Sequence, residues 1–236
     1  DQYGPVLRAT SPPAQQGRVL VSKDRHGGEV NVSPVISPDG KQMVFFSSKG
    51  LFSIDLFLAD AATGEIKRKL TDTAVNPHLD SLEFVNSAGA WSADGRSFAF
   101  GSVSEGRPQL QIYDIAGGKT TRRIPLRDLG EIYNPTWSPD GKQIAFSAIA
   151  GGITDLFAVN VENGEVHRLT NDTFADLQPA WSPDGSRIAF VTDRFTSNSS
   201  DLYSGQYRLA LLNPDTGDIE PVPGFETGKH INPQWA

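Results

Sequence analysis

Two rows of polar residues stand at fixed distances before a repeated anchor residue, and their side chains are suited to binding chemistry. Asn134, Gln178 and Asn232 each stand three residues before an anchor. Asn31, Asp176 and His230 each stand five residues before one. Alternate residues of a strand point to the same side, so we expect both rows to share one strand face. Amides donate and accept hydrogen bonds, which suits capture of a polypeptide end or loop, although a hydrated channel lining needs the same polarity.

Signatures of catalysis and metal binding are missing from the sequence. The chain has no cysteine, no G-x-S-x-G elbow and no H-E-x-x-H motif, and its four histidines lie far apart. Four aspartates recur with the repeat, either as metal ligands or as acceptors within their own turns: Asp39, Asp94, Asp140 and Asp184. Their recurrence favours the turn. We therefore expect no catalytic residue, no metal site and no cofactor on this chain.

The anchor residues define an internal repeat. They are the first residues of Trp-Ser-Pro-Asp-Gly motifs or close variants, and they stand at Ile36, Trp91, Trp137, Trp181 and Trp235. Successive anchors are 44 to 55 residues apart, which is the length of a propeller blade. The bulky anchors are expected to pack between blades rather than to form an aromatic cage.

Each repeat is predicted to contain four strands. A first strand precedes the anchor, and Pro-Asp-Gly turns the chain into a short second strand that is apolar throughout, such as Ile144–Phe146. Unbroken apolarity indicates burial on both faces. A third strand and a glycine-containing turn lead to a polar fourth strand, such as Ile66–Thr71, which suits an exposed sheet edge.

Length and composition agree with this fold and exclude several partners. The 236 residues contain 23 Gly and 16 Pro, which is typical of many strands and tight turns. A net charge of −7 argues against nucleic acid or an anionic membrane as partner, and no apolar run is long enough to span a membrane. We predict an all-β protein over residues 1–236: a single β-propeller domain of four-stranded antiparallel blades, with four complete repeats and partial blades at both ends.

The W-S-P-D-G turns, the I-A-F and D-L-F strands and the G-E…L-T exits together resemble the TolB-like β-propeller repeat, over about residues 30–236. The resemblance implies a bacterial, periplasmic or otherwise exported propeller that binds other proteins. Propellers of this family usually have six blades, whereas four complete units are present here. Two interpretations stay open: a piece of a larger propeller, or five blades closed by strands near Pro5–Ala9, Arg18–Ser22 and Ile231–Trp235.

The leading functional hypothesis is a non-catalytic, monomeric scaffold that binds a protein or peptide in its channel. The first alternative is an accessory, substrate-gating propeller of a metallopeptidase, prolyl-oligopeptidase-like or tricorn-like peptidase, because similar propellers stand beside such catalytic domains. A third hypothesis is an enzyme that uses an ion in the channel. Two longer inserts, at residues 71–90 and 193–201, are further candidate interaction surfaces.

Overall fold

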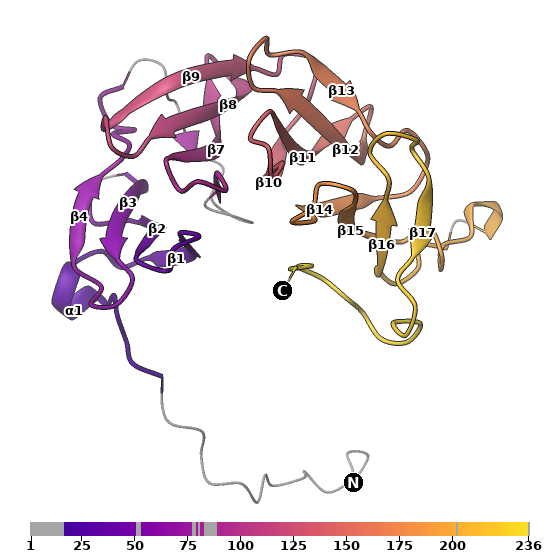
Figure 1. Ribbon diagram of the computed structural model, residues 1–236, viewed down its shortest axis with the longest axis horizontal. Helices are drawn as coiled ribbons and strands as arrows, with labels where there is room; N and C mark the ends of the chain where they lie inside the picture. The colour runs from indigo at the N-terminus through magenta and orange to yellow at the C-terminus, as the bar shows by residue number, and fades with distance from the viewer. Residues whose placement is uncertain are drawn as a thin grey trace, which may run out of the picture.

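Four antiparallel β-sheets stand around an open centre like the blades of a propeller (Figure 1). The computed structural model describes residues 17–50, 53–76, 79, 81–82, 89–201 and 203–235. In each sheet the strands follow one another from the centre outward in chain order. The predicted all-β fold of four-stranded antiparallel blades is confirmed.

The strand bounds follow the four repeats. Blade 1 contains β1 (Asn31–Ile36), β2 (Gln42–Ser47), β3 (Asp55–Asp60) and β4 (Ile66–Lys69). Blade 2 contains β5 (Ser81–Leu82), β6 (Ala90–Trp91), β7 (Ser97–Ser104), β8 (Arg107–Asp114) and β9 (Lys119–Pro125), and both β5 and β6 pair with β7. Blade 3 contains β10 (Ile132–Trp137), β11 (Gln143–Ala150), β12 (Ile153–Asn160) and β13 (Val166–Arg168). Blade 4 contains β14 (Asp176–Trp181), β15 (Ile188–Thr192), β16 (Arg208–Leu212) and β17 (Ile219–Pro221).

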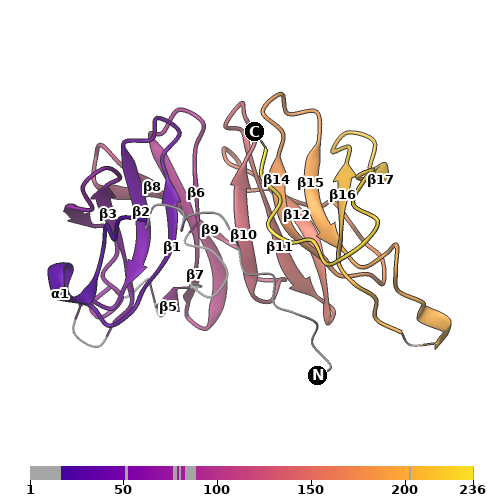
Figure 2. The same cartoon turned by 90° about the horizontal axis from the view of Figure 1, so that it is seen from below.

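Helical structure is confined to two short elements of the described chain, α1 (Lys23–His26) and the 3₁₀ turn η1 (Ser199–Asp201). Neither these nor any other described segment forms a helix of the length and apolarity that crossing a membrane requires. Figure 2 shows the blades standing side by side, with the hairpin turns gathered at the two ends of the strands.

The apolar middle strands supply the core between blades. Val44 and Phe46 of β2 pack into a cluster shared with blade 2, whereas Met43 and Phe45 point to the other face of the sheet. Burial on both faces is therefore the reason that these strands show no polar alternation. The outer strands are polar as predicted, and the three residues of β13 are all exposed.

Within the described residues, the two ends of the chain do not form the strands that the five-blade interpretation required. Pro5–Ala9 lies outside the described residues, and Arg18–Ser22 forms no strand. Instead, Leu20 and Val21 pack on the outer apolar face of blade 1, where a neighbouring sheet would otherwise lie. Ile231–Trp235 also forms no strand. It nevertheless lies where the first strand of a further blade would lie, because the Trp235 indole N–H donates to the Ala180 carbonyl of blade 4.

The repeated aspartates close their own turns, as predicted. In blade 4 the Ser182 hydroxyl donates to Oδ1 of Asp184 at 2.6 Å, and that oxygen also accepts from the backbone N–H of Ser186 at 3.0 Å. The Arg187 N–H in turn donates to the Ser182 hydroxyl at 3.0 Å. The same set of bonds recurs in the other three blades, centred on Asp39, Asp94 and Asp140.

Candidate functional site

A left-handed residue followed by proline interrupts the first strand of each of three blades and recurs before Trp235. These residues have φ between 49° and 55°, and they are Ser33, Asn134, Gln178 and Asn232. In β1, β10 and β14 the strand register shifts at this point. Non-glycine residues adopt this conformation at an energetic cost, and such strain is concentrated at functional sites. The sequence signal for the bulge is the polar-residue–proline pair.

These bulges border a pocket at the centre of the propeller. The pocket has a volume of about 660 Å³ and is lined from all four blades and the C-terminal segment. Its wall combines the four left-handed residues, the prolines that follow them, and the indoles of Trp91, Trp181 and Trp235. Figure 1 shows β1, β10, β14 and the C-terminus converging on this centre.

Three of the six predicted binding residues line the pocket, and three do not. Asn134, Gln178 and Asn232 are part of its wall. The expectation that the row five before the anchor shares their face is wrong. The bulge breaks the alternation of the strand, so Asp176, on that second row, is fully buried and lies outside the pocket.

The other two residues of that second row make local contacts instead. The Asn31 side-chain amide donates to the Gly28 carbonyl at 3.1 Å. His230 Nε2 lies 2.7 Å from the Thr227 carbonyl, and the imidazole meets the Phe225 ring edge-on at 5.1 Å between centroids. Neither residue is part of the pocket wall.

The pocket wall is uncharged although the chain carries a net charge of −7. Every described residue that lines it is a serine, threonine, amide, proline, alanine, valine, isoleucine or tryptophan. The wall amides also contact each other, since the Asn232 N–H donates to Oε1 of Gln178 at 2.7 Å. The wall therefore offers hydrogen-bonding and apolar groups together. Its described residues supply no carboxylate or imidazole that could bind the channel ion of the enzyme hypothesis.

The tryptophan anchors connect neighbouring blades near this pocket. The indole N–H of Trp91 donates to the Val35 carbonyl of blade 1 at 3.0 Å, and that of Trp137 donates to the Ala90 carbonyl of blade 2 at 3.1 Å. Trp235 makes the equivalent bond to Ala180 at 2.9 Å, so the C-terminal segment docks as a blade would. The predicted packing between blades is confirmed for Trp91, Trp137 and Trp181, whereas Ile36 is 57% exposed and Trp235 is 41% exposed. Trp91 also meets Phe98 edge-on.

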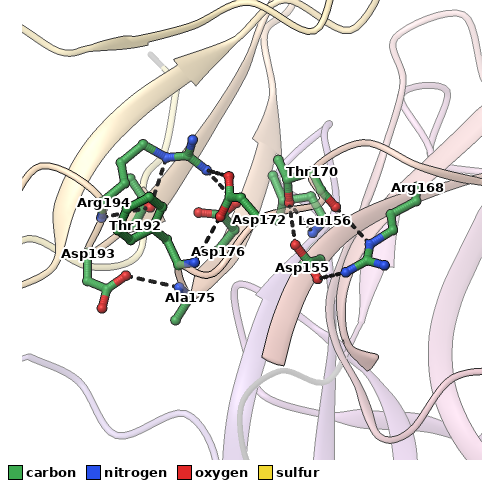
Figure 3. A network of polar contacts seen from close by, with 11 residues as sticks. Asp155, Leu156, Arg168, Thr170, Asp172, Ala175, Asp176, Thr192, Asp193 and Arg194 are labelled. Atoms are coloured by element: carbon green, nitrogen blue, oxygen red, sulfur yellow. Dashed lines mark hydrogen bonds and ion pairs between the residues drawn. The ribbon is translucent and has the colours of Figure 1, made fainter. Parts of the chain in front are cut away.

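The junction between blades 3 and 4 differs from the others. The Trp181 indole N–H is buried and has no hydrogen-bond partner among the described residues. Charged residues meet there instead, as Figure 3 shows. Arg194 Nη2 lies 2.7 Å from Oδ2 of Asp176 and 3.0 Å from Oδ2 of Asp172. The Arg194 guanidinium also lies over the Phe174 and Phe190 rings.

Asp155 of β12 adds a third carboxylate to this junction. Its Oδ1 accepts from the Thr170 hydroxyl at 3.2 Å, and its Oδ2 pairs with Arg168 (Figure 3). Burial raises the pKa of the Asp176 carboxyl, although the positive charge of Arg194 opposes this shift. The repeat pattern predicted Asp176 in the channel and did not indicate this cluster, because Asp155 and Arg194 lie about twenty residues from it along the chain.

The sheets and the central pocket define the protein as a β-propeller, and the comparisons identify its family. The family model described as the TolB beta propeller domain matches residues 88–208, so the chain belongs to the TolB β-propeller domain family. A comparison with curated protein sequences found no match.

Solved structures agree with this assignment. TolB from Acinetobacter baumannii is 26% identical with a TM-score of 0.63, and the match covers 81% of this chain and 43% of that one. A putative TolB from Agrobacterium tumefaciens is 24% identical with a TM-score of 0.63, covering 82% of this chain and 65% of that one. This chain therefore spans less than two thirds of either relative.

A peptidase shares the fold as well. A puromycin-hydrolyzing peptidase from Mycobacterium tuberculosis is 18% identical with a TM-score of 0.56. That match covers 84% of this chain and 32% of the peptidase. At this identity the likeness concerns the fold alone.

Proposed function

We propose that this chain is a non-catalytic propeller that binds a polypeptide segment in its central pocket, in an exported, periplasmic protein. The observation that carries the proposal is the uncharged wall of amides, prolines and indoles at the centre of a TolB-family propeller. An amide hydrogen-bonds a peptide backbone as both donor and acceptor, and proline and tryptophan provide apolar contact area.

The lack of charge on the described wall residues favours an uncharged ligand. A charged terminus or phosphate entering the pocket would lose water without gaining an opposite charge from any described residue of the wall. A neutral loop or segment loses less solvation and can satisfy its backbone groups on Asn134, Gln178 and Asn232. These residues remain the proposed binding residues, and the chain is proposed to act as a monomer.

A capture experiment tests the proposal. The wild-type chain and the Asn134→Ala/Gln178→Ala variant are immobilised and exposed to periplasmic extract, after a check that both melt alike. Losing a buried hydrogen-bond partner costs about 1–3 kcal/mol, so the double variant should bind a captured partner at least about tenfold more weakly. A matched control is Gln143→Ala/Asn171→Ala, which removes two exposed side chains outside the pocket.

Equal capture by both double variants would remove the pocket from the proposal and leave the inserts as the binding surface. Of the two predicted inserts, residues 193–201 form part of a second pocket of about 330 Å³ between blades 3 and 4. The insert at residues 71–90 is only partly described, and its Thr71 and Thr73 hydroxyls donate to the Asp55 carboxylate of blade 1.

A peptidase-associated role is the second candidate, because peptidases share the fold over most of this chain. A puromycin hydrolase variant complexed with PGG is 19% identical with a TM-score of 0.60, and the match covers 85% of this chain and 30% of that one. In such a protein the propeller would control substrate access to a separate catalytic domain. Reading the coding sequence on both sides of this chain distinguishes the two roles: a hydrolase or metallopeptidase segment favours the second.

A further inference from the structure

Three aspartates from two segments of the chain converge between blades 3 and 4, away from the central pocket. Asp155 belongs to β12, Asp172 follows β13, and Asp176 begins β14 (Figure 3). One carboxylate oxygen from each residue lies within 4.8 Å of those of the other two. Oxygen atoms bound to one calcium ion at 2.3–2.6 Å can be no farther apart than about twice that bond length, so this spacing fits a single ion.

The two arginines at the cluster leave part of its charge uncompensated. Arg168 pairs with Asp155, and Arg194 pairs with both Asp172 and Asp176. Three carboxylates and two guanidiniums leave one net negative charge. Arg194 contacts the Oδ2 atoms of its two partners, so it lies on one edge of each carboxylate.

A second, independent observation points to a ligand. Oδ1 of Asp176 is buried, on a side chain with no exposed surface, and no described donor meets it with hydrogen-bond geometry, although the Thr192 and Thr170 hydroxyls lie near enough to this carboxyl to stabilise its charged form. Nearly all buried polar atoms have a partner, and a bound ion or water is the usual reason when no protein donor is present. A carboxylate oxygen is the acceptor for which this deficiency is most costly.

We propose that Asp155, Asp172 and Asp176 bind one calcium ion, with Oδ1 of Asp176 as its buried ligand. Calcium accepts irregular sets of six to eight oxygen ligands, whereas magnesium requires near-octahedral geometry at shorter distances. The Asp172 side chain is 32% exposed, so water can complete the coordination from that side. The ion connects blade 3 to blade 4 at the junction where the indole hydrogen bond is missing.

Blade 1 provides a matched control for this site. Asp55 there accepts from Thr71 at 3.0 Å and pairs with Lys69 at 2.9 Å, just as Asp155 contacts Thr170 and Arg168. The described residues form no second acidic group of this kind around Asp55. Asp55→Asn therefore perturbs the equivalent threonine and cation contacts, and in addition those with Ser53 and Thr73, without removing a proposed ligand.

The test is calorimetric titration of the chelator-treated chain with calcium chloride. We expect saturable binding of about one ion per chain, with weaker binding of magnesium. Asp155→Asn and Asp172→Asn should each weaken calcium binding at least about tenfold, the loss typical even of groups that only support a metal ligand. Asp55→Asn should bind calcium as the wild type does.

Asp172→Asn, with its partly exposed side chain, keeps the test valid if Asp155→Asn fails to fold. The absence of saturable calcium binding by the wild type would overturn the proposal and leave a buried water as the partner of Asp176. Equal weakening by Asp55→Asn and Asp172→Asn would also overturn it. Because the cluster lies outside the central pocket, either result leaves the proposed function intact.

Discussion

Two neighbouring blade junctions in this propeller are held together by different chemistry. Between blades 2 and 3 the Trp137 indole donates to the Ala90 carbonyl, and the hydrophobic cluster against which it packs includes Leu110 and Ile144. Between blades 3 and 4 the Trp181 indole N–H has no partner among the described residues, its backbone N–H donates to the Thr136 hydroxyl at 3.4 Å, and Arg194 of blade 4 pairs with Asp172 in the loop that joins the two blades. The comparison shows that one repeated sequence position can serve packing in each blade while the polar contacts across the junction vary.

The largest expected loss of stability comes from removing the tryptophan side chain at the junction between blades 2 and 3. Trp137→Ala should destabilise the chain by roughly 3–5 kcal/mol, because it removes a large packed side chain and its hydrogen bond to blade 2. Urea unfolding followed by circular dichroism measures the change. Trp235→Ala is the matched control and should cost much less, since Trp235 is 41% exposed. Equal losses for the two variants would mean that burial of the anchor does not determine its contribution.

Removing the arginine from the charged junction between blades 3 and 4 should lower the stability of the chain almost as much. Arg194→Met, measured with chelator present, should destabilise the chain by about 3 kcal/mol because it leaves the buried Asp176 carboxylate without its counter-charge. Adding Asp176→Asn to that variant should recover part of the loss, since a neutral amide is less costly to bury. If the double variant were less stable than Arg194→Met alone, the buried charge would not be the cause.

A smaller effect isolates the indole hydrogen bond itself. Trp137→Phe and Trp181→Phe remove similar ring volume, but only Trp137 loses a bond to a carbonyl. Trp137→Phe should therefore cost about 1 kcal/mol more than Trp181→Phe in the same urea experiment. Equal costs would show that Trp181 finds an acceptor in solution and that the two junctions are alike in this respect.

The smallest effect concerns the repeated turn, which both junctions share. The Ser182 hydroxyl and the Ser186 N–H lower the pKa of Asp184 from 3.8 to about 2. A folded-state pKa below the unfolded value stabilises the fold above pH 3.8, and this contribution is lost as the pH falls toward 2. Asp184→Asn should therefore flatten the fall in stability between these pH values. Thermal melts that decline equally steeply in both proteins would contradict this assignment.

The fold could be predicted from the repeat because each of its motifs determines structure within a few residues along the chain. Pro-Asp-Gly fixes a turn, and the apolar second strand reports burial on both faces, so four blades could be inferred without knowledge of distant contacts. The N-terminal strand at Arg18–Ser22, which only the five-blade interpretation required, does not form, because a few apolar residues can cover a sheet face without forming a strand.

The pocket was only partly predictable for a similar reason. The periodicity correctly placed Asn134, Gln178 and Asn232 together, but the left-handed residue before each proline ended the simple alternation. Asp176 therefore points into the blade junction rather than into the channel. Asp172 and Asp176 of the cluster are four residues apart, but Asp155 and Arg194 come from distant parts of the chain, and no spacing within the sequence encodes their proximity to this pair.

The binding of a polypeptide in the central pocket is the central claim, and site-specific photo-crosslinking tests it most directly. A photoreactive residue replaces Ile36, which is 57% exposed and lines the pocket, or Val166, which is 37% exposed on the outer strand β13. After irradiation in periplasmic extract, the Ile36 variant should form a discrete covalent adduct. Its yield should be the same whether the extract contains about 0.1 M or about 1 M salt during irradiation, because salt screening does not weaken binding to an uncharged wall. Adducts from the Val166 position alone would contradict the claim.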